Sequence, residues 1–98
     1  MAYTVTTIIE RPDDSTDWFP STTEVRNIRR NLNTDGKRLS FTSSESDDGL
    51  TLTTEVVFDN KASYDEYVSD EKIAQDRINR RTYYTNNNVV SNTSFAGS

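Results

Sequence analysis

Cysteine and histidine are both absent from this chain, and each absence excludes a class of chemistry. Without cysteine the chain has no disulfide, no thiolate metal site and no cysteine nucleophile. Without histidine it lacks the commonest general base and metal ligand, and no Ser-His or Cys-His catalytic arrangement can form. We therefore expect no metal and no cofactor, and these absences weigh against an enzymatic function without excluding one.

Basic side chains and long apolar runs are scarce as well. The chain has 11 lysines and arginines against 16 aspartates and glutamates, which gives a formal charge of -5. Binding to a phosphate backbone requires a basic surface, so we expect no nucleic-acid partner. No apolar run reaches the length of a membrane span or of a signal segment. We expect no membrane contact and a cytoplasmic location, in the host cytoplasm if the chain is viral.

The length of 98 residues predicts one domain, residues 1–98, with a single core. Hydrophobic residues make up only 32% of the chain. Five tyrosines, four phenylalanines and one tryptophan nevertheless provide a large buried area per residue. The composition therefore favours a folded domain with a thin, aromatic core.

The first half of the chain predicts a strand, a loop and a helix. Residues 2–10 are β-branched and aromatic, which favours a strand. The loop that follows holds Trp18 and Phe19, and we expect it to fold back over the core, with a ligand lid as the alternative. Residues 21–24 have the capping-box pattern of a helix start, and residues 33–36 end the helix.

The middle of the chain predicts a β-hairpin. Asp48-Gly49 is typical of a two-residue type I′ turn. The resulting register sets Phe41 opposite Val56 and Leu39 opposite Phe58, so that the large apolar side chains share one face of the hairpin. The other face is polar and rich in threonine, and it carries Ser40, Thr42, Thr51, Thr53, Glu55 and Val57.

A second helix and a final strand complete the pattern. Residues 63–66 again fit a capping box, and a second start signal at Ser69-Asp70 predicts a kink or a fresh first turn. An apolar stripe of helical period is predicted along Tyr64, Tyr67, Glu71, Ala74, Ile78 and Thr82. Residues 89–95 have the composition of a strand.

The element order βαββαβ predicts an α+β fold of ferredoxin-like type, with a four-stranded antiparallel sheet and two helices on one face. The stretch VVFDNKASYDEYVSDEKIAQD resembles the junction of third strand and second helix in the dimeric α+β barrel proteins. In that family two sheets pack face to face, so the resemblance implies a homodimer. Its members include cofactor-independent oxygenases, isomerase-like enzymes and haem-degrading enzymes. Haem-degrading members need a histidine ligand, which this chain lacks, and no active-site motif of the family is present.

Three functions remain open. The first is a homodimeric binding or interaction module with Thr42, Thr51, Thr53, Glu55 and Val57 as interface or ligand contacts. The second is a cofactor-independent oxygenase- or isomerase-like enzyme that uses Glu55, a tyrosine or Trp18 in a cavity between helices and sheet. The third is an acidic inhibitor or adaptor of viral or mobile-element (phage) origin that binds a host protein.

Further candidates lie near the end of the second helix. Tyr83 and Tyr84 could stack on a ligand, and packing at the helix end is the simpler role. Arg77, Arg80 and Arg81 could bind an anion. Complementarity with the helix dipole and an Asp76–Arg80 pair explain these arginines without a ligand.

Overall fold

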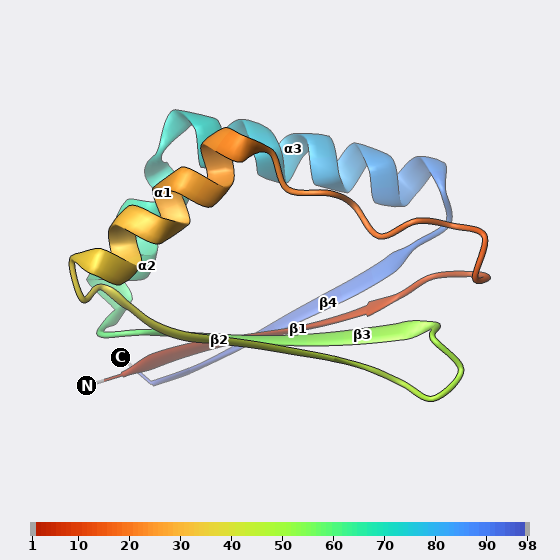
Figure 1. Ribbon diagram of the computed structural model, residues 1–98, viewed down its shortest axis with the longest axis horizontal. Helices are drawn as coiled ribbons and strands as arrows, with labels where there is room; N and C mark the ends of the chain where they lie inside the picture. Colours follow the sequence, from red (N-terminus) through yellow and green to blue (C-terminus); the bar gives the residue numbers. More distant parts are fainter. Residues whose placement is uncertain (1, 98) are drawn as a thin grey trace.

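A computed structural model describes residues 2–97 as one antiparallel sheet with helices along one of its faces (Figure 1). The elements follow in the order β1 (Tyr3–Glu10), α1 (Thr23–Thr34), β2 (Arg38–Glu45), β3 (Thr51–Phe58), α2 (Lys61–Ser69), α3 (Glu71–Asn86) and β4 (Val90–Gly97). The sheet order is β2-β3-β1-β4. The predicted ferredoxin-like architecture is thereby confirmed, with the second predicted helix divided into α2 and α3.

Strand β1 lies inside the sheet and carries the core. It pairs with β3 and with β4, and Val5 lies opposite both Val56 and Phe95. Tyr3, Val5 and Phe58 form a buried cluster against which Tyr64 and Tyr67 of α2 pack. This aromatic cluster lies at the end of the sheet that α2 covers (Figure 1).

The hairpin of β2 and β3 has the predicted register over most of its length, with Phe41 opposite Val56. Its turn is longer than predicted, because the Ser46 amide donates to the Thr51 carbonyl at 2.9 Å. A type I′ turn needs positive φ at both central residues, whereas in this turn only Gly49 has it, at 73°. The two-residue type I′ prediction is thus wrong, although the alternation of the strands is preserved.

The start of β2 also differs from the prediction. Arg38 lies opposite Phe58 and Ser40 opposite Val57, so the ladder is irregular between them. This irregularity leaves Leu39 56% exposed instead of in the core. Arg38 takes the predicted place of Leu39 opposite Phe58, with consequences for the site.

Helix α1 begins one residue later than the capping box predicts. Thr22 is its N-cap and accepts a hydrogen bond from the Val25 amide at 3.3 Å. The hydroxyl of Ser21 is therefore available to another partner, Arg29. The helix ends where predicted, before Gly36 with φ 74°.

A break at Asp70 separates α2 from α3, in agreement with the predicted second start. The Asp70 carboxylate caps α3 and accepts from the amides of Lys72 and Ile73 at 2.9 and 3.2 Å. The break changes the phase of the helix, so Ile73 and Asp76 are buried and Ile78 is 54% exposed. The predicted apolar stripe is therefore wrong beyond Asp70. The cap of α2 is Asn60 and not Ser63.

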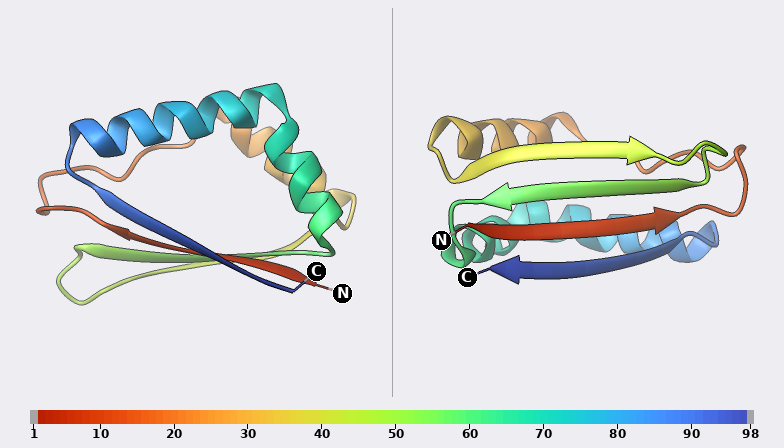
Figure 2. Two further views of the ribbon diagram at one scale, coloured as in Figure 1. Left: turned by 180° about the vertical axis from the view of Figure 1, so that it is seen from behind. Right: turned by 90° about the horizontal axis from the view of Figure 1, so that it is seen from below.

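The other face of the sheet is uncovered. Figure 2, seen from below, shows the four strands in front of all the helices. Cross-strand neighbours on this face include Ile8 opposite Thr53 and Thr6 opposite Glu55. No helix within residues 2–97 is long and apolar enough to cross a membrane.

Candidate functional site

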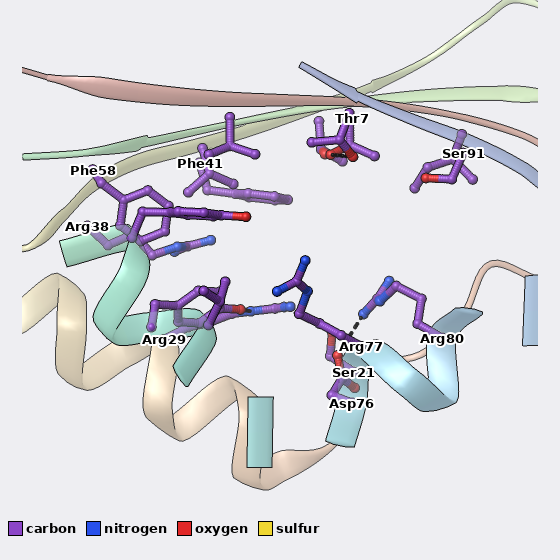
Figure 3. Close-up of a pocket in the computed structure, with 18 of the residues that line it drawn as sticks. Thr7, Ser21, Arg29, Arg38, Phe41, Phe58, Asp76, Arg77, Arg80 and Ser91 are labelled. Atoms are coloured by element: carbon purple, nitrogen blue, oxygen red, sulfur yellow. Dashed lines mark hydrogen bonds and ion pairs between the residues drawn. The ribbon is translucent and has the colours of Figure 1, made fainter. Parts of the chain in front are cut away.

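A cleft of about 380 Å³ lies between the helices and the covered face of the sheet (Figure 3). All four strands and all three helices contribute to its lining. The residues of the sheet that face it alternate along β1, β3 and β4, as Val5, Thr7 and Ile9 do on β1. On β2 they are Arg38 and Phe41, because the start of that strand is irregular. A volume of this size is in the range of small-molecule sites.

Aromatic side chains form one end of the cleft. The Phe58 ring contacts the rings of Tyr64 and Tyr67, with centroids 5.5 and 5.7 Å apart. Phe41 and Phe95 come from the two edge strands and remain 49% and 51% exposed. Flat apolar walls are therefore available, two of them at the open edges of the sheet.

Hydroxyl groups occupy the middle of the sheet side. Thr7 and Thr93 lie opposite each other on β1 and β4, and their Oγ1 atoms are 3.2 Å apart. Thr54 and Ser91 also line the cleft. The side chains here are small and polar, whereas a filled core would carry large apolar ones, so the space between sheet and helices stays open.

Four arginines surround the cleft, and this is its main electrostatic feature. Among the described residues that line it, Asp76 has the only carboxylate and there is no lysine. The lining thus has a formal charge of +3 in a chain whose formal charge is -5. The four residues are Arg29, Arg38, Arg77 and Arg80.

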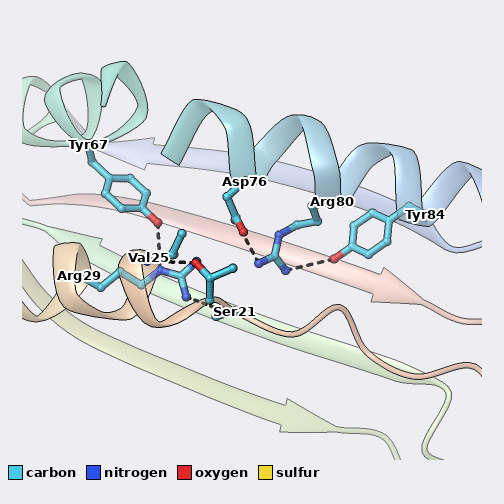
Figure 4. Close-up of polar contacts among 8 residues, drawn as sticks. Ser21, Val25, Arg29, Tyr67, Asp76, Arg80 and Tyr84 are labelled. Atoms are coloured by element: carbon cyan, nitrogen blue, oxygen red, sulfur yellow. Dashed lines mark hydrogen bonds and ion pairs between the residues drawn. The ribbon is translucent and has the colours of Figure 1, made fainter. Parts of the chain in front are cut away.

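Neutral partners hold Arg29 at the cleft. Its Nε donates to the Tyr67 hydroxyl at 3.0 Å, and its Nη1 donates to Ser21 Oγ at 3.0 Å (Figure 4). These contacts join α1, α2 and the segment before α1. Because neither partner is charged, the position of Arg29 is fixed while its positive charge is not neutralised.

Arg38 lies beside the ring of Phe41, with its guanidinium 5.2 Å from the ring centroid. Its Nη1 donates to the Asn33 side-chain oxygen at 3.2 Å. Burial lowers the pKa of Arg38, and the positive charge of Arg29 lowers it further. The two guanidiniums are therefore close enough to repel each other.

Asp76 and Arg80 form the one ion pair among the described residues that line the cleft. Their Oδ2 and Nη2 atoms are 3.4 Å apart, and Asp76 is only 6% exposed. Arg80 also donates to the Tyr84 hydroxyl at 3.5 Å and lies 4.8 Å from the Phe19 ring centroid. Figure 4 shows this second chain of contacts along α3. The pairing predicted from the sequence is confirmed.

Arg77 differs from the other three. Figure 3 shows its side chain pointing from α3 towards the sheet, across the middle of the cleft. No hydrogen bond or ion pair with any described residue holds its guanidinium. Burial raises the pKa of Tyr64, and the charge of Arg77 partly offsets that rise. Arg77 is thus the arginine of this lining whose guanidinium has no partner among the described residues.

The residues predicted on the polar hairpin face lie on the uncovered face of the sheet. Thr42 lies opposite Glu55. Thr51 and Thr53 are opposite Glu10 and Ile8, and Val57 is opposite Thr4. None of the predicted set lines the cleft. The hypothesis that Glu55 acts in a cavity between helices and sheet is therefore wrong, because its strand points it to the other side.

The three predicted aromatic site residues, Trp18, Tyr83 and Tyr84, do not lie together in the structure. Tyr84 lines the cleft, whereas Tyr83 packs against Phe19 and donates to the Asp17 carbonyl. Trp18 lies against the Arg11 guanidinium at 4.4 Å and donates to Glu45 Oε1 at 3.1 Å. The loop therefore folds back on the hairpin and α3 and not over the core as predicted, and Trp18 does not line the cleft.

Sequence reasoning found part of the arginine cluster. Of the three arginines that the sequence indicates as anion candidates, Arg77 and Arg80 line the cleft, whereas Arg81 is exposed and lies outside it. Sequence analysis does not identify Arg29 and Arg38, because they belong to α1 and β2 and approach α3 only in the folded chain. For the α3 part of the site, the available signal is the helix start at Asp70. Counted from this start, one face of α3 carries Asp76, Arg77, Arg80 and Tyr84.

Comparison with solved structures identifies the fold. SnoaB, a cofactor-independent oxygenase from Streptomyces nogalater, matches with a TM-score of 0.60 and 8% identity over 99% of this chain and 92% of its own. Rv0793 from Mycobacterium tuberculosis matches with a TM-score of 0.58 and 13% identity over 98% and 94%. A dimeric ferredoxin-like protein from an uncultured marine organism matches with a TM-score of 0.61 and 8% identity over 97% and 92%.

The chain has the ferredoxin-like fold, as its element order predicts. The resemblance stated from the strand–helix junction is confirmed at the level of the fold. No family model matches the chain, and no curated protein matches its sequence. At these identities the likeness establishes the fold, and the function must be argued from the residues of this chain.

Proposed function

We propose that the protein is a homodimeric small-molecule binding protein whose ligand lies in the cleft between the helices and the sheet. The observation that carries the proposal is the cleft itself. Its walls are aromatic, its middle is lined by hydroxyls, and Arg77 extends into it without a protein partner. A few placed polar groups in an otherwise apolar concavity are typical of ligand sites.

The uncovered sheet face supports the homodimer. It is not a solvated lysine and glutamate surface, because β-branched residues dominate it and Ile8 and Val90 are 42% and 53% exposed. A second copy packed on this face would cover these side chains and leave the cleft open on the other side. One of the matching structures is described as dimeric.

An oxygenase-like activity is the alternative. It is favoured by the similarity to a cofactor-independent oxygenase and by the position of the cleft. The residues of the cleft support binding more directly than catalysis. Asp76 is its only carboxylate among the described lining residues, and that group is already paired with Arg80. Turnover of a bound ligand under air, measured as oxygen consumption, would favour the enzymatic alternative.

The dimer is tested by substitution at the centre of the uncovered face. Thr53→Arg places a charge beside Ile8, and we expect it to convert a dimer into a folded monomer. Light scattering coupled to size exclusion gives the mass. Thr82→Arg, on the exposed side of α3, adds the same charge elsewhere and should leave the dimer intact. A monomeric wild type would contradict this part of the proposal.

Ligand binding is tested separately with N-phenyl-1-naphthylamine, a neutral fluorescent aromatic compound. We expect enhanced probe fluorescence together with NMR shifts at Val5, Val56 and Tyr67 of the cleft. Shifts confined to the uncovered face, or none at all, would contradict a ligand site in the cleft. Trp18 fluorescence should stay unchanged, because that residue lies outside it.

The third hypothesis, an acidic inhibitor or adaptor, stays a prediction. A pull-down of host proteins at low salt tests it.

A further inference from the structure

We propose that the ligand of this cleft is an organic anion with a flat apolar body, and that Arg77 binds its acidic group. This inference rests on the proposed ligand site and names the chemical class that the site takes. It is carried by the distribution of charge, by the choice of arginine and by the arrangement of the aromatic walls.

The lining of the cleft has a formal charge of opposite sign to that of the whole chain. The formal charge is -5 overall, yet the described lining of the cleft carries four arginines and one aspartate. Arg29 and Arg38 stay close enough that one lowers the pKa of the other. Clustering like charges in a partly desolvated space is unfavourable by itself. A bound anion would relieve this repulsion, because it brings the missing negative charge.

Local contacts account for three of the arginines but not for the fourth. Arg80 is paired with Asp76, Arg29 is held by two hydroxyls, and Arg38 is bonded to the Asn33 amide oxygen. Arg77 extends towards the sheet with no such contact among the described residues (Figure 3). Arg77 is exposed overall, so a ligand can reach it without displacing a protein partner among the described residues.

The absence of lysine from the described lining indicates the geometry of the acidic group. A guanidinium presents a planar pair of donors that matches a carboxylate or sulfonate, whereas an ammonium is a point charge. The rings of Phe58, Tyr64 and Tyr67 lie together at one end of the cleft. At this end Tyr67 accepts a hydrogen bond from Arg29, and Arg38 lies opposite Phe58. A planar apolar body against these rings would leave its acidic group within the cluster of guanidiniums.

The same observations favour a small anion over a polymer. Arginine charges that line a concave site focus an attractive field locally. The formal charge of the chain is -5, so its outer surface would repel an extended polyanion. A small organic acid can pair with the arginines of the cleft although the outer surface of the protein is not basic.

The test compares two probes of nearly the same aromatic body. 1-Anilinonaphthalene-8-sulfonate carries one negative charge, and N-phenyl-1-naphthylamine lacks it. We expect the wild-type protein to bind the sulfonate about tenfold more tightly than the neutral compound, and to lose this advantage as salt is raised. NMR shifts at Val5 and Tyr67 locate each probe in the cleft.

Arg77→Gln is the decisive variant, with Arg81→Gln as its control on the same helix outside the cleft. Arg77→Gln should weaken sulfonate binding about tenfold and leave binding of the neutral probe unchanged. Arg81→Gln should change neither. Unfolding midpoints of both variants, measured by circular dichroism, show that each is folded.

Equal binding of both probes, unaffected by Arg77→Gln, would overturn the anion inference while leaving the ligand site established. Failure of both probes to shift cleft residues would overturn the proposed function and the inference with it. The two failures are therefore distinguishable in one series of titrations.

Discussion

Asp48 illustrates how a single carboxylate is used in the turn between β2 and β3. Its Oδ1 accepts from Ser46 Oγ at 2.6 Å and from the Leu50 amide at 3.0 Å. The Ser46 hydroxyl, and after it the Leu50 amide, lowers the pKa of Asp48 below its ordinary value of 3.8. Since the folded pKa is the lower one, this contribution to stability is present above pH 3.8 and is lost as the pH falls through the folded pKa.

We therefore expect Asp48→Ala to lower the unfolding midpoint at neutral pH, and the difference from wild type to shrink as the pH falls through the acid range. Thermal unfolding followed by circular dichroism at several pH values measures it. Asp47→Ala, the neighbouring carboxylate with no hydrogen bond to the described residues, is the matched control. A difference that stays constant with pH would show that the ionised carboxylate is not the stabilising group.

Arg38 and Leu39 show how a local change of strand register alters the lining of the cleft. A regular hairpin would place Leu39 opposite Phe58 and Arg38 on the other face. The irregular ladder sets Arg38 opposite Phe58 and leaves Leu39 exposed. One guanidinium thus joins the cleft where alternation alone predicts a leucine.

The break at Asp70 decides which side of α3 faces the cleft. Asp70 has extended backbone angles, φ -61° and ψ 133°, so the chain cannot continue α2 through it. Its carboxylate then starts α3 with two amide hydrogen bonds. Arg77 and Arg80 line the cleft because α3 begins at this residue in this phase.

We expect Asp70→Ala to reduce the free energy of unfolding by about 1 kcal/mol, the usual loss for an N-cap. Urea denaturation measures it. Asp65→Ala is the control, because Asp65 makes an exposed i,i+4 pair with Lys61 and caps no helix. Equal losses in the two variants would argue that the cap does not stabilise α3.

At the scale of the whole molecule, one sheet serves two separate surfaces. Thr7 faces the cleft and Thr6, its neighbour, faces the uncovered side opposite Glu55. Because successive strand residues point to opposite faces, a substitution on β1 can reach either surface alone. The proposed ligand site and the proposed dimer interface are therefore separable by experiment.

Thr7→Phe should fill part of the cleft and abolish binding of the neutral probe, while the mass by light scattering stays that of the wild type. Stability should hold or rise by about 1 kcal/mol, because the ring buries apolar area in an existing space. Thr6→Phe is the comparison and should show the reverse, with probe binding retained and the oligomeric state changed. Loss of binding in both variants would contradict the separation of the two surfaces.

Local patterns in the sequence were sufficient for the fold. Alternation fixed the pairing of Phe41 with Val56, and start and stop signals placed both helical regions and the second start at Asp70. The polar hairpin face was also foreseen, since Thr53 and Glu55 share a face in any regular strand. These features depend on neighbours a few residues apart, and the sequence records such neighbours directly.

Only the tertiary structure decided the cleft. Arg29, Arg38 and Arg77 come from α1, β2 and α3, and their meeting depends on the irregular start of β2, the use of Thr22 as a cap and the phase set by Asp70. Each of these is a one-residue choice among near-equal local alternatives. Packing of the whole chain selects among them, because a shift of one residue turns a side chain from core to solvent.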